Sequence, residues 1–182
     1  MITNDSMNTG NNNNGCSPTN FGFLFSLLAL LIGIISIFII GTQDFLSGVQ
    51  IQLQGDVTTV AVGDPVIFDT VLNDQSSEIS YNDVTGEITI TESGLYYINW
   101  WVSVDGAAAA TTIDLAIVTS AGDTITASSP IVSSQVSGNA LLSITATPAT
   151  PVTVQLINTS TDELFIGATT VRADLTIINT SI

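Results

Sequence analysis

From Val49 onward the sequence is a series of short β-type segments, and this series leaves few architectures open. Each segment is rich in Val, Ile, Thr or Tyr, and turn residues such as Gly, Asp and Pro separate it from the next. The first, "VQIQLQ", alternates apolar and polar residues, as a strand does when one of its faces is buried. The predicted strands are 49–54, 57–62, 65–72, 86–90, 95–104, 111–119, 124–128, 139–147, 151–158 and 169–178. Strands at this spacing, with no long helix between them, predict an all-β antiparallel sandwich or jelly roll.

The first 48 residues have a different texture. Residues 1–20 are rich in Asn, Thr, Ser and Gly, which predicts a flexible arm. Residues 21–41 predict an apolar helix, because "FGFLFSLLALLIGIISIFII" is uncharged, Asn20 can cap its start and Gly41 suits its end. Residues 42–48 form a linker to one domain, 49–182. At 1.5 Å per residue the helix would be about 30 Å long, the thickness of a hydrocarbon core.

Two uses of this helix stay open. Its length favours a membrane helix, but residues 1–48 contain no Lys or Arg to orient one. Small residues recur along the helix at intervals of 4, 3, 4 and 3, which is a heptad seam that lets helix backbones approach closely. The seam consists of Gly22, Ser26, Ala29, Gly33 and Ser36. We therefore interpret the helix first as a buried connector between subunits and second as a single-pass membrane helix.

The charge balance excludes several classes of function. The chain has a formal charge of −15, with 16 carboxylates, one Arg, no Lys and no His. Nucleic acid is excluded as a partner because binding phosphates requires several cations. A chain without His or Lys also lacks the usual general bases and Schiff-base amines. We therefore predict no catalytic, cofactor-binding or metal-binding residue, and expect a protein that is not an enzyme. Cys16 is the only cysteine, so an internal disulfide is excluded, and two readings stay open: an unpaired thiol with no role and an intermolecular crosslink.

Part of the β region carries a recognisable pattern. The segments "PVIFDTVLN" and "YNDVTGEITITESGLYYINW" resemble the trimeric globular heads of the complement and tumour necrosis factor type, and "QVSGNALLSI" resembles a later segment of those heads. The residues that match the pattern are Phe68, Tyr81, Ile88, Gly94, Tyr96, Ile98 and Trp100. The resemblance covers about 49–182 and implies a trimeric jelly roll. Ile88 and Ile98 stand where an aromatic residue is usual, and no ligand site of the family can be transferred.

The small, Thr- and Ala-rich texture is similar to the heads of collagen-like glycoproteins on bacterial spores, although no Gly-x-y tract is present. "LYYINWW" is apolar on both sides, which predicts a strand buried on both sides and favours a trimer. We expect an extracellular structural subunit that trimerises and then assembles head to tail, through its arm and helix, into a fibre on a bacterial or spore surface. Other spore-surface proteins are further candidate partners. The alternative is a membrane-anchored trimeric binding head.

Overall fold

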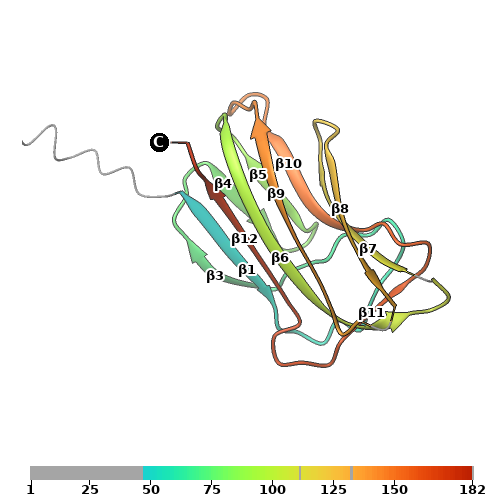
Figure 1. Cartoon of the computed structure of the whole chain (residues 1–182). Coiled ribbons are helices and arrows are strands. Elements are labelled where there is room, and N and C mark those ends of the chain that lie inside the picture. Colours follow the sequence, from blue (N-terminus) through green and yellow to red (C-terminus); the bar gives the residue numbers. More distant parts are fainter. Residues whose placement is uncertain (1–46, 111, 132, 182) are drawn as a thin grey trace, which may run out of the picture. The chain divides into compact units, whose positions relative to one another are not determined.

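Two antiparallel β-sheets packed face to face make up the residues that the structure describes, which are 47–110, 112–131 and 133–181 (Figure 1). The structure is a computed structural model. The predicted arm, the apolar helix with its seam, Cys16 and most of the linker lie outside these residues. Within the described part of the chain, no helix is long and apolar enough to cross a membrane.

The larger sheet has seven strands and the smaller one has five. The larger contains β1 (Gly48–Leu53), β2 (Thr59–Val60), β3 (Thr70–Asp74), β6 (Gly94–Ala107), β9 (Gln135–Ile144), β11 (Leu164–Ile166) and β12 (Ala173–Asn179). Their order is β2-β11-β6-β12-β1-β3, and β9 also pairs with β6. The smaller sheet contains β4 (Ile79–Asn82), β5 (Glu87–Ile90), β7 (Thr112–Thr119), β8 (Thr124–Pro130) and β10 (Val152–Asn158), in the order β4-β5-β10-β7-β8. The predicted all-β antiparallel class is therefore confirmed.

The core lies between the sheets and follows from alternation along the strands. In β1, Val49, Ile51 and Leu53 are buried while the residues between them are partly exposed. The strands β10 and β12 alternate in a similar way over most of their length. Burying one such aliphatic side chain stabilises the fold by about 1.5–3 kcal/mol. The largest fully buried side chains come from both sheets and, for Phe68, from the chain just before β3: Trp100, Tyr96, Phe68, Ile51, Leu53, Ile79, Ile88, Ile90, Ile98, Ile113, Leu115 and Ile117.

The long strand β6 organises the larger sheet. It pairs with β9 from Gly94 to Ser103, with β12 from Tyr96 to Val102, and with β11 near its end. Its inward residues Tyr96, Ile98 and Trp100 are buried in the core. The outward residues in its first half are not covered by the described chain, since Leu95 is 40% and Tyr97 36% exposed. The single chain covers only the inward side of this strand, so the predicted burial of both sides stays a prediction that depends on a partner copy.

Several predicted strands are shorter in the structure, or displaced. The segments 57–62 and 65–72 contain only β2 and the start of β3, because the chain between these two strands changes sheets. Val66 donates its N–H to Leu156 of β10, whereas Asp69 donates its N–H to Gln52 of β1, so no continuous ladder forms. The strand predicted at 139–147 begins at Gln135 and ends at Ile144, and the one predicted at 169–178 begins at Ala173.

Two short strands were not predicted, β4 and β11. Both have only three or four residues, which is too short for alternation to stand out. A turn over residues 120–123 joins β7 to β8. There Gly122 has a φ of +102°, a backbone conformation that glycine adopts without steric cost.

Candidate self-association face

The outward side of four neighbouring strands, β9, β6, β12 and β1, forms one continuous surface (Figure 1). Strand register decides which side chains share it, because alternate residues of a strand point to the same side. We call this surface the outer β6 face. It consists of Gln135, Ser137, Asn139, Leu141 and Ser143 of β9, Leu95, Tyr97, Asn99, Trp101 and Ser103 of β6, Asp174, Thr176 and Ile178 of β12, and Gly48, Gln50 and Gln52 of β1.

One row across this face is apolar. Leu141 lies opposite Tyr97, Tyr97 lies opposite Ile178, and Ile178 lies opposite Gly48. Side chains in directly opposite positions are about 5 Å apart, so the row is contiguous. Leu141 is 60% exposed, and Leu95, two residues before Tyr97, adds a further exposed apolar side chain. Contiguous exposed apolar side chains are typical of contact surfaces, which makes this row a candidate contact surface.

The next row carries amides. Asn139 lies opposite Asn99, Asn99 lies opposite Thr176, and Thr176 lies opposite Gln50. A side-chain amide has both donors and an acceptor, so a row of amides can hydrogen-bond to an identical row. A second copy of the same chain is therefore a chemically suitable partner for this part of the face.

Asp174 is the only carboxylate of the outer β6 face. Its side chain accepts hydrogen bonds from Nε2 of Gln50 at 2.9 Å and from Nε2 of Gln52 at 2.8 Å. The residue is only 9% exposed. Two amide donors thus satisfy this charge within the chain, and the face presents very little negative charge to a partner.

The outward side of the smaller sheet differs. Its residues, by register, are Ser80, Asn82, Glu87, Thr89, Thr112, Asp114, Ala116, Val118, Thr124, Thr126, Ser128, Pro130, Thr153, Gln155 and Ile157. The large apolar side chains that are exposed in the described residues are Val62, Val71, Leu72, Val84, Leu95, Tyr97, Leu141 and Phe165, and none belongs to that side. The two sides of the sandwich are thus chemically unequal, and the apolar one is the outer β6 face.

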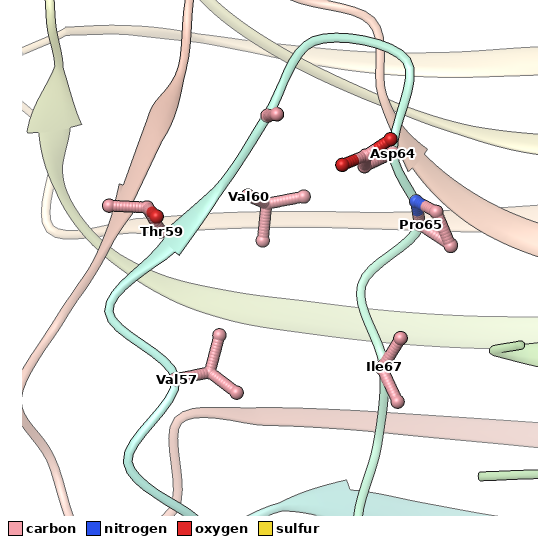
Figure 2. Close-up of a pocket in the computed structure, with 7 residues that line it drawn as sticks. Val57, Thr59, Val60, Asp64, Pro65 and Ile67 are labelled. Atoms are coloured by element: carbon pink, nitrogen blue, oxygen red, sulfur yellow. The ribbon is translucent and has the colours of Figure 1, made fainter. Parts of the chain in front are cut away.

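A small pocket lies elsewhere, between residues 57–61 and 64–67, whose two stretches of chain face each other (Figure 2). Val57, Val60, Pro65 and Ile67 supply most of its wall, and Asp64 is the only titratable residue of the lining. Its volume of about 210 Å³ is below the roughly 300–1,000 Å³ typical of small-molecule sites. Among the described residues, no group of three or more His, Cys, Asp or Glu side chains could hold a metal ion. The pocket therefore offers no acid–base pair and carries no functional assignment.

The residues of the family pattern line the inside of the sandwich. Phe68, Ile88, Tyr96, Ile98 and Trp100 are buried, Tyr81 is half-buried, and Gly94 begins β6. The Tyr81 ring meets the Phe68 ring edge to face, with centroids 6.2 Å apart. Burial raises the pKa of Tyr81 to about 12, against the opposing effect of its hydrogen bond with the Phe68 backbone. In the described structure these residues contribute to packing.

The amide row and the two glutamine hydrogen bonds to Asp174 were not predicted from the sequence. A signal for them exists, because four strands place uncharged polar residues at outward positions although the chain has 16 carboxylates. Recognising this signal requires the strand register, which places residues as distant in sequence as Gln50 and Asn139 in one row.

Comparison with solved structures supports the fold. The globular domain of zebrafish complement 1qA matches with a TM-score of 0.54 at 17% identity, covering 74% of this chain and 97% of that one. The Eiger TNF of S. frugiperda matches with a TM-score of 0.55 at 10% identity, covering 75% and 93%. The PRD1 vertex protein P5 matches with a TM-score of 0.52 at 14% identity, covering 73% and 96%. No protein-family model and no curated protein matches the sequence.

These similarities cover nearly the whole of each matched chain but involve few identical residues. They show a shared architecture, and the strand orders of both sheets agree with a sandwich of two antiparallel sheets. The β region of this chain therefore has the jelly-roll fold of the complement 1q and tumour necrosis factor heads.

Proposed function

We propose that this chain is a non-enzymatic structural subunit that forms a trimer through its outer β6 face. The observation that carries the proposal is the composition of this face, with an apolar row, an amide row and one internally satisfied carboxylate. Two copies of a chain with a charge of −15 repel each other wherever their carboxylates meet. A nearly uncharged face is the surface on which such copies associate at the lowest electrostatic cost.

We infer three copies per assembly from the resemblance to trimeric heads, which rests on Phe68, Tyr81, Gly94 and Tyr96. The exposed side chains of Leu95 and Tyr97 support it, because they belong to a strand whose sequence is apolar on both sides. A neighbouring copy supplies the cover that the single chain lacks. An ordinary sandwich-core strand in a monomer would leave these two residues in contact with water.

The trimer is one step in a larger assembly. The residues before the jelly roll connect trimers head to tail, with the seam of 21–41 packing against a neighbour and Cys16 crosslinking the joint. A contact of this head-to-tail kind does not close on itself, so it grows into a filament. The setting is the outer surface of a bacterium or a spore. The absence of Lys and Arg around the apolar helix supports a connector over a membrane anchor.

Mass measurement by light scattering tests the trimer. The measurement uses the chain that lacks residues 1–41, which is expected to be a soluble trimer. In this shortened chain, Leu141→Asp and Tyr97→Asp are expected at one copy, and Thr126→Asp, on the other sheet, again at three. A monomeric shortened chain, or a Leu141→Asp variant of it that stays trimeric, contradicts the role of the face.

Electron microscopy of the full-length protein in detergent-free buffer tests the fibre. Filaments with a trimeric repeat support it. Isolated trimers argue against it, and recovery in membranes alone favours the second candidate, a membrane-anchored trimeric binding head. That candidate is favoured by one observation, the uncharged length of the run 21–40.

A further inference from the structure

A hollow on the outer β6 face lies beside Gly48, at one end of the apolar row. It has a volume of about 190 Å³. Its lining consists of Gly48, Val49, Gln50, Asn73, Gln75, Thr176, Ile177 and Ile178, and none of these residues is charged.

The missing side chain of Gly48 keeps the hollow open. A Cβ at this position would lie 2.8 Å from the carbonyl oxygen of Ile177, so the close backbone contact excludes any larger residue. The N–H of Gln75 donates to the carbonyl of Gly48 and holds the far wall in place. The pairing of β1 with β3 shifts in register between Gln50 and Ile51, beside the hollow. The hollow is thus a fixed feature of the backbone.

The opposite end of the same row projects outward. Leu141, on β9, is 60% exposed, the highest exposure of a large apolar residue on this face. Three strand spacings separate β9 from β1, which places Leu141 about 14 Å from the Gly48 strand. Leu141 therefore cannot fill the hollow of its own chain.

We propose that Leu141 of one copy inserts into the Gly48 hollow of the next copy; this rests on the proposed self-association through the outer β6 face. The projection and the hollow have matching character, since Ile178 supplies apolar surface and Gln50 and Gln75 supply uncharged polar surface. Each copy offers one projection and one hollow at different places, which makes the contact heterologous. Three such contacts close a ring.

Site-directed crosslinking in the full-length chain tests the insertion. The native thiol is first removed by Cys16→Ser, and Leu141→Cys and Gln75→Cys are introduced together. Within one chain these positions are four strand spacings apart, about 19 Å, which is far beyond the reach of a disulfide. Oxidation, or a bis-maleimide shorter than that spacing, can therefore join them only between copies. Both positions are solvent-exposed, so the variants are expected to keep the circular dichroism of the parent.

The expected result is a covalent ladder that stops at three chains on a denaturing gel. Each single-cysteine variant is expected to stop at two. The matched control, Leu141→Cys with Thr126→Cys on the outward side of β8, is expected to give no three-chain species. If the double variant assembles as trimers, or as filaments with a trimeric repeat, but yields no three-chain product, the insertion is wrong and the trimer stands. If the parent is a monomer or a dimer by native mass, both the insertion and the trimer are wrong.

Discussion

The hydroxyl group of Tyr81 donates a hydrogen bond to the carbonyl oxygen of Phe68 at 2.9 Å and accepts one from the N–H of the same residue at 2.7 Å. One side chain of β4 therefore satisfies both backbone groups of a residue in the stretch where the chain changes sheets. That stretch forms no continuous ladder, so Tyr81 supplies hydrogen bonds that a strand partner would otherwise supply.

Replacing Tyr81 with Phe is expected to destabilise the fold by about 1–3 kcal/mol, because the buried N–H and carbonyl of Phe68 lose their partner. Urea denaturation measures the change. Tyr97→Phe is the matched control, since it removes a hydroxyl from a partly exposed ring and should change the free energy of unfolding little. Equal midpoints for the two variants would show that the Tyr81 hydroxyl contributes nothing.

Alkaline pH is expected to weaken the fold through tyrosine ionisation. Burial raises the pKa of Tyr81 to about 12, and burial also raises the pKa of Tyr96. An unfolded tyrosine ionises near pH 10. The stabilisation is thus fully present below about pH 10 and is lost as the pH rises toward the folded-state pKa. The free energy of unfolding, measured from neutral to alkaline pH, should fall for the wild type and less steeply for Tyr81→Phe. Parallel curves would contradict the assignment to Tyr81.

Gly138 is expected to tolerate no side chain. It lies opposite Trp100 in the β9–β6 pair, and a Cβ there would be 2.6 Å from Cζ2 of Trp100 and 2.9 Å from Cβ of Ala127. Gly138→Ala should therefore overpack the core and cost about 1–3 kcal/mol. Thermal unfolding and tryptophan fluorescence measure it, with the exposed neighbour Ser137→Ala as control. An unchanged melting temperature would mean that the Trp100 ring shifts without cost.

Asn158 holds the loop after β2. It is fully buried, and its amide nitrogen donates to the carbonyls of Val60 at 2.9 Å and Asp162 at 3.2 Å. Asn158→Asp replaces this donor with an acceptor, so we expect a loss of about 1–3 kcal/mol. Gln54→Glu makes the same chemical change at an exposed position and should cost little. Hydrogen exchange should show faster opening of residues 60–63 in Asn158→Asp, and unchanged exchange would contradict the role of the amide.

Alternation predicted most of the sandwich because it reflects burial of one strand face. It worked best for β1, whose apolar residues Val49, Ile51 and Leu53 all face the core. It failed where hydrogen bonding changes partner between sheets, as at Val66 and Asp69. It also missed the start of β9, where Gly138 weakens the strand signal but fits under Trp100.

The candidate face was only half visible in the sequence. The apolar outward residues of β6 indicated that something covers them. The partners Leu141 and Ile178 could not be assigned, because they reach Tyr97 through pairings that depend on the register of β9 and β12. The hydrogen bonds to Asp174 are a similar case, since their donors Gln50 and Gln52 lie more than a hundred residues away in sequence.

Asp174 is the one carboxylate of the outer β6 face and is hydrogen-bonded to amides, so the effect of salt on association differs from that in an interface of ion pairs. An interface held by ion pairs loosens as ionic strength rises, because salt screens attraction. Here the outer β6 face has no cation to pair with, and what salt screens is the repulsion among the carboxylates around it. Added sodium chloride is therefore expected to tighten association, which sedimentation at increasing ionic strength measures. The ionic strength of the solution is therefore expected to control when the subunits associate.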